Sequence, residues 1–436
     1  MLWIKNGRVM NPSNGLDEHI NILPIDGKIA KITPKTLEEI INESETCKIE
    51  DVEVLDATDC IVAPGLVDVH VHFRDPGFTY KEDIETGAKA ALKGGFTSVV
   101  LMANTKPTVD NEETLAYVLE KGAKTDLHVY TCAAVTKGLG GKELTDMDTL
   151  LAKGAAGFTD DGIPIMDEEV LEKAMRKAAK LGVPVSLHEE DASLITNNGV
   201  NRGKASEHYG IGGSPREAEI SLIKRDLEVA LKTGAILNVQ HISTKEGVEL
   251  VRQAKQRSTT HAIHAEATPH HFSLNEEAVI KYGTLAKMNP PLREEEDRLA
   301  ILEGLKDGTI DIIATDHAPH SEEEKAKPLT EAPSGIIGLE TALSLGVTNL
   351  VHKNILTMSE LLAAMTCNPA NMYGLQAGTL EEGKAADMVI FSENEEWTVG
   401  DYESKSKNSP FTGMNLQGVV KYTITDGKIA YQKGSR

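Results

Sequence analysis

Short apolar runs alternate with longer amphipathic stretches through the middle of the chain. Eight of these runs have the length and the branched, apolar composition of buried strands, and they cover residues 66–72, 97–102, 127–134, 155–159, 183–188, 235–241, 262–267 and 310–315. The clearest amphipathic stretch, Glu168–Leu181, repeats its apolar residues at the spacing of a helix. Eight strands that alternate with helices predict an α/β fold, a closed parallel (β/α)8 barrel of the TIM type.

An open, doubly wound sheet is the alternative interpretation of this alternation. Sheets of that kind bind nucleotides through a glycine-rich turn that follows a strand. Neither GxGxxG nor GxxxxGK[ST] follows any of the eight runs. The pattern therefore favours the barrel.

The two ends of the chain have a different pattern, made of short strands and tight turns. Asn6-Gly7 and Asp26-Gly27 separate apolar stretches near the beginning, and Asp426-Gly427 does so near the end, as in β-hairpins. The string Asp-Gly-Lys-Ile-Ala occurs at both ends, at 26–30 and at 426–430. We predict one small β domain formed by residues 1–62 and 373–436, around a hydrolase barrel of residues 63–372.

The overall charge limits the partners of the chain. A formal net charge of -22 argues against nucleic acid and against an anionic membrane surface as partners. No apolar run reaches the length of a membrane-spanning helix, and the first residues lack the basic start and apolar stretch of a signal peptide. An anionic small-molecule substrate would require a pocket that is locally positive.

The cysteines indicate the redox environment. Cys47, Cys60, Cys132 and Cys367 are scattered, and none forms a CxxC pair. This usage fits a reducing compartment better than a disulfide-stapled secreted framework, so we expect a cytoplasmic protein.

The first strand of the predicted barrel ends in a pair of histidines. His70 and His72 are two residues apart, so on a strand both side chains point to the same face. Two neutral imidazoles that face one point are half of the ligand set of a first-row metal ion. The pair therefore predicts a metal site at the end of this strand.

Other strands of the predicted barrel end in similar residues. Asp160-Asp161 follow the fourth strand, while His188, His241 and Asp316 follow the fifth, sixth and eighth. These ends share one face of a barrel, where catalysis takes place, and four histidines with two carboxylates suit two metal ions bridged by a carboxylate. We expect only one of the two neighbouring aspartates to reach the metals, and the other to be a turn residue.

Two further residues predict the chemistry of the site. Asp316 closes the last strand next to the ligands, so it is the candidate that would carry a proton to the leaving nitrogen of a hydrolysed amide. Arg74 directly follows the paired histidines and could hold a substrate carboxylate through two parallel hydrogen bonds.

Five strings of the sequence carry a family resemblance. They cover residues 64–77, 158–162, 241–246, 287–293 and 314–320, and they extend from the first strand to beyond the eighth. These strings resemble the amidohydrolase superfamily and, within it, the class I dihydroorotases. Asn-Pro-Pro-Leu-Arg and Phe-Thr-Asp-Asp-Gly are the more specific strings, because the first and last also resemble those of other cyclic amidases.

The resemblance implies a ligand set and a reaction. His70 and His72 would bind one metal ion and His188 and His241 a second, with Asp161 as the bridge where many relatives have a carboxylated lysine, and Asp316 as ligand and proton shuttle. Zinc is the default expectation, and manganese and cobalt are the alternatives for the same ligands. A hydroxide between the two metals would serve the reversible cyclisation of N-carbamoyl-L-aspartate to dihydroorotate in pyrimidine synthesis. The implied substrate contacts are His72, Arg74, Asn104, Asn289, His320, Ser334 and Gly335.

Some alternatives remain open at this level. Methionine and alanine precede Asn104 where the family string has proline before the asparagine, and the charged segment 317–335 is either a loop that closes over substrate or a solvated connection. An allantoinase, a hydantoinase or dihydropyrimidinase, and a non-catalytic scaffold for a transcarbamoylase are the competing functions. The resemblance also implies a homodimer and a possible association with aspartate transcarbamoylase.

Overall fold

The computed structural model describes residues 1–42 and 52–434, and each predicted barrel strand overlaps a strand in it. The third predicted run is divided at Cys132 into two short strands. The barrel strands are β8 (Leu66–Val71), β9 (Phe96–Leu101), β10 (His128–Thr131), β11 (Ala133–Ala134), β12 (Phe158–Thr159), β13 (Pro184–Leu187), β14 (Ile236–Val239), β15 (Ile263–Ala267) and β16 (Ile312–Ile313).

Parallel pairing joins these strands into two sheets, which meet at both of their edges. The sheet orders are β10-β9-β8 and β11-β12-β13-β14-β15-β16. At one junction the chain runs directly from β10 into β11, and Cys132 N donates to Leu101 O at 2.9 Å. At the other junction Val71 forms a parallel bridge with His317, and His72 N donates to His317 O at 2.9 Å. The predicted TIM-like α/β barrel is thus confirmed.

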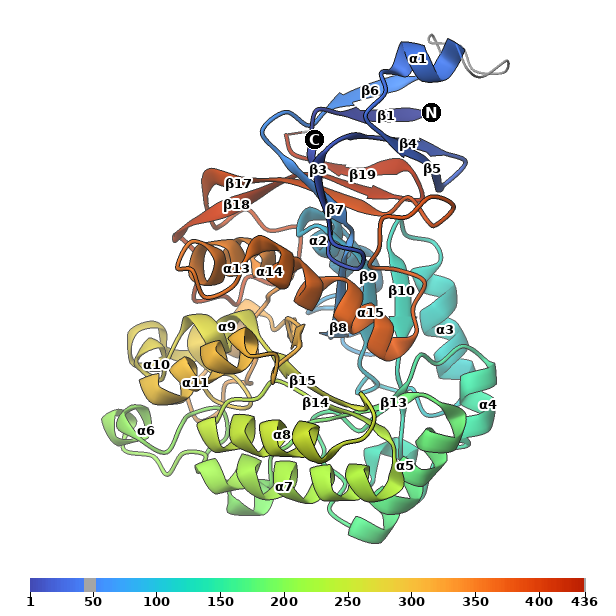
Figure 1. Ribbon diagram of the computed structural model, residues 1–436. Coiled ribbons are helices and arrows are strands. Elements are labelled where there is room, and N and C mark those ends of the chain that lie inside the picture. Colours follow the sequence, from blue (N-terminus) through green and yellow to red (C-terminus); the bar gives the residue numbers. More distant parts are fainter. Residues whose placement is uncertain (43–51, 435–436) are drawn as a thin grey trace.

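Helices lie outside the strands and around the barrel (Figure 1). The predicted helix α5 (Glu168–Leu181) begins after the N-cap residue Asp167 and ends at Gly182, whose φ of 70° suits glycine. Its buried face contains Leu171, Ala174, Met175 and Ala178, which recur at the spacing of a helix. The other long helices are α2 (Ile84–Lys93), α3 (Glu112–Gly122), α7 (Arg216–Thr233), α8 (Lys245–Arg257), α11 (Glu295–Lys306), α14 (Met358–Met365) and α15 (Cys367–Tyr373).

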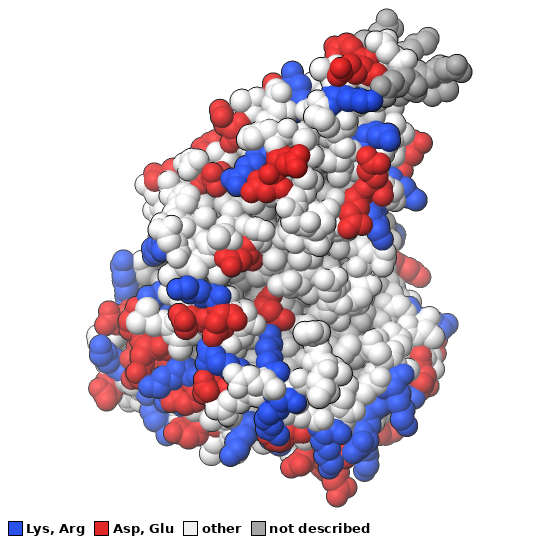
Figure 2. Space-filling model, in the orientation of Figure 1, with Lys and Arg blue, Asp and Glu red and all other residues white. Residues whose placement is uncertain are grey.

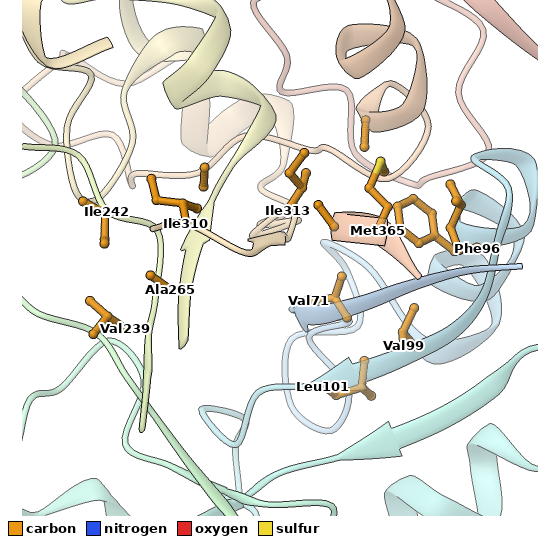
Figure 3. Close-up of a cluster of buried hydrophobic side chains, with 14 of the residues drawn as sticks. Val71, Phe96, Val99, Leu101, Val239, Ile242, Ala265, Ile310, Ile313 and Met365 are labelled. Carbon is orange, nitrogen blue, oxygen red and sulfur yellow. The ribbon is translucent and has the colours of Figure 1, made fainter. Parts of the chain in front are cut away.

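Aliphatic side chains fill the core, as expected from an aromatic content of only 4%. Figure 3 shows Val71, Val99 and Leu101 from β8 and β9, with Ala265 and Ile313 from β15 and β16 on the other side of the cluster. All five are buried, and burying a side chain such as valine contributes about 1.5–3 kcal/mol. This packing fixes the positions at which the strands end.

The strands of the two chain termini form two further sheets, at the top of Figure 1. The strand β7 (Ile61–Pro64) pairs with β2 (Arg8–Asn11) on one side and with β17 (Met388–Thr398) on the other, so both ends of the chain share one sheet. The division at residues 62 and 372 stays a prediction. The remaining terminal strands are β1 (Leu2–Lys5), β3 (Leu16–His19), β4 (Asn21–Ile25), β5 (Lys28–Thr33), β6 (Glu53–Asp56), β18 (Asn415–Thr425) and β19 (Lys428–Gln432).

Ala386 lies between the two copies of the Asp-Gly turn and forms a hydrogen bond with each of them. Gly27 O accepts from Ala386 N at 2.9 Å, and Ala386 O accepts from Gly427 N at 3.0 Å. Both glycines have positive φ angles, 77° and 71°, which the tight turns require. The two copies of the string therefore connect the beginning and the end of the chain.

The surface carries charges of both signs. In Figure 2 acidic and basic side chains are intermixed on the described part of this face, which lacks the extended basic stripe typical of nucleic-acid binding. No helix in residues 1–42 and 52–434 combines the length and the apolar character that a membrane span needs. The cysteines in these ranges, Cys60, Cys132 and Cys367, are free thiols, and Cys47 lies outside them.

Candidate metal centre and active site

The structure brings all six predicted ligands together at the carboxyl ends of the barrel strands. Each of them lies at or within a few residues of the end of its strand, and their exposed fractions are at most 7%. We call this group the mouth cluster, and it consists of His70, His72, Asp161, His188, His241 and Asp316.

The distances divide the mouth cluster into two overlapping groups. Asp316 Oδ1 lies 3.0 Å from His72 Nε2 and 3.5 Å from His70 Nε2. On the other side, His188 Nδ1 lies 3.0 Å from His241 Nε2. Asp161 stands between these groups, with Oδ1 3.5 Å from His70 Nε2 and 3.9 Å from His188 Nδ1, and Oδ2 3.5 Å from His72 Nε2.

These residues fit the binding of metal ions. His70 Nε2 is buried and has no hydrogen-bond partner among the described residues, although a buried polar atom without a partner is unfavourable. His70, His72 and Asp316, and separately His70, Asp161 and His241, bring one ligand atom each to within 4.8 Å of one another. Imidazole and carboxylate together are the ligands that borderline first-row metals prefer.

The local electrostatics hold two of the ligands in the form that binds metal. Burial, with the neighbouring His188 and His70, keeps the pKa of His241 well below its usual value, so this ring is neutral. Burial alone would raise the pKa of Asp161, but the surrounding histidines outweigh it and hold that pKa below its usual range. A neutral imidazole and an ionised carboxylate are the states that metal coordination requires.

The two neighbouring aspartates after β12 point to different partners. Asp160 accepts from Val135 N at 2.8 Å and from Thr136 N at 3.0 Å, and it also binds the Thr136 hydroxyl. It therefore fixes the segment that follows β11. Asp161 faces the histidines instead.

Sequence reasoning missed two carboxylates, which contact the ring nitrogens of His70 and His188 that point away from the centre of the mouth cluster. Glu266 Oε2 lies 3.0 Å from His70 Nδ1, and Glu190 Oε2 lies 3.1 Å from His188 Nε2. Such contacts fix the orientation and tautomer of a ligating ring. The sequence offered two signals for these carboxylates. Glu266 lies inside the apolar run 262–267, and Glu190 lies two positions after His188.

The backbone is strained at three positions of the site. Arg74, His241 and Asp316 have φ angles of 59°, 28° and 45°, in a region that residues other than glycine rarely adopt. Residues of this kind cluster at active sites, where the surrounding structure holds them in place.

The predicted substrate contacts lie in two places next to the mouth cluster. Asn104 Oδ1 is 3.0 Å from His72 Nδ1, and Asn104 Nδ2 donates to Asp161 Oδ2 at 2.9 Å. Arg74 Nη2 lies 3.5 Å from His320 Nε2, while Arg74 Nε donates to Pro319 O at 3.3 Å. The guanidinium and this imidazole therefore occupy one small region.

The remaining predicted contacts extend that region. His320 Nε2 lies 2.8 Å from Ser334 O, and a side chain at Gly335 would collide with the His320 ring, because a Cβ there would be 2.6 Å from His320 Cδ2. Asn289 Oδ1 is buried and has no partner among the described residues, as is typical of a group that awaits a ligand.

The segment 317–335 is packed in this structure. It contains the short helix α12 (Glu322–Lys325), which begins with a capping box at Ser321 and Glu324. Glu322 and Glu323 are exposed, as in a solvated connection, but Lys325 is buried. His317 turns from the mouth cluster, with Nδ1 accepting from Gly338 N at 3.1 Å.

A parallel barrel with four imidazoles and two carboxylates at its carboxyl end defines a metal-dependent hydrolase. Residues 61–430 match the amidohydrolase family, and the chain belongs to this family.

Similar proteins of known name agree with this class. The chain is 54% identical to a dihydroorotase of Clostridioides difficile (strain 630), over 99% of this chain and 100% of that protein. It is 50% identical to a dihydroorotase of Lactococcus lactis subsp. lactis, over 99% of each. Among solved structures, the L-hydantoinase (dihydropyrimidinase) of Arthrobacter aurescens is similar with a TM-score of 0.87 and 26% identity, over 100% of this chain and 96% of that one.

Proposed function

We propose that this chain is a dihydroorotase, which interconverts N-carbamoyl-L-aspartate and dihydroorotate in pyrimidine synthesis. The observation that carries the proposal is the position of Arg74 and His320 beside the mouth cluster. A hydrolytic metal site next to a half-buried guanidinium suits a cyclic amide that carries a carboxylate. The dihydroorotases that are about half identical over their full length support the same substrate.

The mouth cluster would hold two zinc ions per subunit. His70, His72 and Asp316 would bind one, His188 and His241 the other, and Asp161 would bind both. When bound, the ions would lower the pKa of water at the site. They would also polarise the substrate carbonyl group that this water attacks.

Asp316 would move the proton of the reaction. Its Oδ1 lies within 3.5 Å of both His70 and His72, and its side chain is nearly buried, so the carboxylate faces the reacting atoms rather than solvent. In ring opening, the carboxylate would accept a proton from the attacking water and donate it to the departing ring nitrogen. In ring closure, the same carboxylate would take the proton from the attacking ureido nitrogen of carbamoyl aspartate and donate it to the departing oxygen, which would leave as water.

The guanidinium of Arg74 would bind the substrate carboxylate. Dihydroorotate carries this group on its ring, whereas simple hydantoins, dihydropyrimidines and allantoin lack it. Asn104, Asn289 and His320 would contact the ring and its carboxylate, and Ser334 and Gly335 would offer main-chain groups.

A direct assay tests the proposal. The purified protein, supplied with zinc, should interconvert the two compounds, and the concentration of dihydroorotate is followed by its ultraviolet absorbance. Turnover of dihydrouracil, hydantoin or allantoin without turnover of dihydroorotate would favour the second candidate, a hydantoinase or dihydropyrimidinase, which the fold similarity supports. No turnover of any cyclic amide would favour a non-catalytic scaffold.

Three finer expectations stay predictions. The enzyme would be a cytoplasmic homodimer, it could associate with aspartate transcarbamoylase, and residues 1–62 and 373–436 would form one small domain around the barrel. Measurement of the molecular mass in solution tests whether the protein is a homodimer.

A further inference from the structure

Two buried lysines stand out near the proposed carboxylate site. Lys287 precedes the Asn-Pro-Pro-Leu-Arg string, and Lys325 ends α12. Their exposed fractions are only 4% and 5%, whereas lysine is almost never fully buried unless it is paired. Among the residues that the structure describes, no carboxylate forms an ion pair with either ammonium group within 4.0 Å.

Both ammonium groups donate instead to main-chain carbonyls of one segment. Lys287 Nζ donates to Leu329 O at 2.7 Å and to Ala332 O at 2.6 Å. Lys325 Nζ donates to Pro333 O and to Gly335 O, each at 3.0 Å. We call these four contacts the lysine clamp.

The segment held by the lysine clamp has little secondary structure of its own. Residues 328–335 form turns and irregular backbone, so few of their carbonyls have partners in a helix or a strand. Buried carbonyls need a hydrogen-bond donor, and two ammonium groups supply four such bonds here. The two lysines therefore supply four of the hydrogen bonds that hold this segment, beside Asn408 Nδ2, which also donates to Gly335 O at 2.9 Å.

The clamped segment contacts the region that would recognise the substrate. Ser334 O lies 2.8 Å from His320 Nε2, and that nitrogen lies 3.5 Å from Arg74 Nη2. Burial lowers the pKa of His320, and Arg74, Lys81 and Lys325 lower it further, although the carboxylate of Glu324 also lies 3.3 Å from the ring. The positive groups thus gather locally in a chain whose net charge is -22, as an anionic ligand requires.

We propose that Lys287 and Lys325 are positioning residues for the substrate carboxylate. They hold the carbonyls of residues 329–335, this segment holds the ring of His320, and the ring and Arg74 together face the ligand. The proposal rests on the proposed function and names residues that act through others, because neither ammonium group reaches the mouth cluster through a hydrogen bond of its own.

The test compares Lys287→Met and Lys325→Met with Lys327→Met, whose lysine is exposed directly before the clamped segment. Methionine keeps the length of the side chain and removes the ammonium group. In the two clamp variants the KM for dihydroorotate and for N-carbamoyl-L-aspartate should rise about tenfold or more, with kcat within about threefold, because uniform binding is lost. Zinc content should stay as in the parent, and Lys327→Met should match the parent.

Proteolysis supplies an independent measurement. An endoproteinase that cleaves after glutamate should cut at Glu331 faster in the clamp variants than in the parent, and added N-carbamoyl-L-aspartate should slow this cleavage. An unchanged KM in both clamp variants, or a loss of zinc and kcat in place of a rise in KM, would overturn the proposal. A parent that is inactive on this pair would instead overturn the proposed function, and a parent that is active separates the two failures.

Discussion

The two ends of the barrel carry similar sets of side chains with different properties. At the amino end, His128 at the start of β10 lies near Asp387 and Asp426 from the C-terminal part of the chain, and we call these three the basal cluster. Both clusters bring one imidazole and two further ligand atoms to within 4.8 Å of one another. Both clusters therefore combine imidazole with carboxylate, although the basal cluster has only one histidine.

Burial and partners do distinguish the two clusters. In the basal cluster His128 Nε2 lies 3.1 Å from Asp387 Oδ2, and the side chain of Asp426 is 61% exposed. Asp387 Oδ1 also accepts from Asp426 N at 2.9 Å. The mouth cluster instead buries four imidazoles and two carboxylates, and collecting such groups away from water is costly unless something binds them. This difference indicates a ligand site at the mouth and an ion pair at the base.

The strongest test removes one carboxylate from each cluster. Asp161→Ala should abolish measurable activity and reduce the bound zinc, because Asp161 lies between both histidine groups. The matched change Asp426→Ala should leave activity and zinc content unchanged. Metal analysis with the dihydroorotate assay measures both, and a loss of zinc in Asp426→Ala would make the basal cluster a metal site too.

The next largest effect is expected at Asp316. Asp316→Asn keeps the shape of the side chain but cannot take up the proton, so kcat should fall about 10²–10⁴-fold. Steady-state kinetics after zinc loading measures this change. A variant with full zinc content and normal kcat would move the proton transfer to another residue.

Arg74→Met tests the anion site beside the mouth cluster. A hydrogen bond to a charged group is worth about 1.5–3 kcal/mol, so KM for dihydroorotate should rise about 10–100-fold with a smaller change in kcat. If KM does not change, the guanidinium has no part in binding the carboxylate.

The carboxylates behind the rings should have a smaller effect. Glu266→Gln keeps the size of the side chain at His70 but weakens the interaction that orients the ring, so zinc affinity should fall about 10-fold to 100-fold. Competition with a chromogenic chelator measures this affinity. Glu228→Gln, at an exposed ion pair with Arg257, serves as the control and should retain the affinity of the parent.

The smallest effect is expected in the basal cluster and depends on pH. The carboxylate of Asp387, which lies 3.1 Å from the ring, raises the pKa of His128 despite partial burial, so the pair stabilises the fold while the imidazole is protonated. This contribution is complete below the unfolded-state pKa of about 6.5 and disappears as the pH rises through the higher folded-state value.

His128→Gln should therefore lower the free energy of unfolding by about 0.5–1 kcal/mol at a pH of about 5.5, and by nothing measurable at a pH of about 9. Urea unfolding at the two pH values measures the difference. An equal loss at both values would show that packing, rather than charge, determines the role of His128.

The strands and the six residues of the mouth cluster could be predicted from the sequence for one reason. Apolar runs mark the strands, and in a barrel every strand ends at the same face, so a histidine after one run lies near an aspartate after another. His70 and Asp316 are 246 positions apart in the chain, yet this rule was enough to bring them together.

Other features could not be predicted in this way. Glu266 lies within a strand, and the sequence does not tell which face of that strand meets His70. Lys325 lies in a run of charged residues that is typical of a solvated surface, and only the packing of residues 328–335 reveals that its ammonium group is buried. Such contacts depend on the tertiary arrangement rather than on local pattern.

The hydrogen bond from His72 N to His317 O has a consequence for how the enzyme matures. It joins the first strand of the barrel to the last, and it lies between the residues that would coordinate one metal ion. Until residues 310–320 have been synthesised, the nascent chain lacks Asp316, and the proposed metal site is incomplete. A product truncated before residue 310 would contain the other five residues of the mouth cluster but would lack Asp316, and with it both a ligand and the proposed proton carrier.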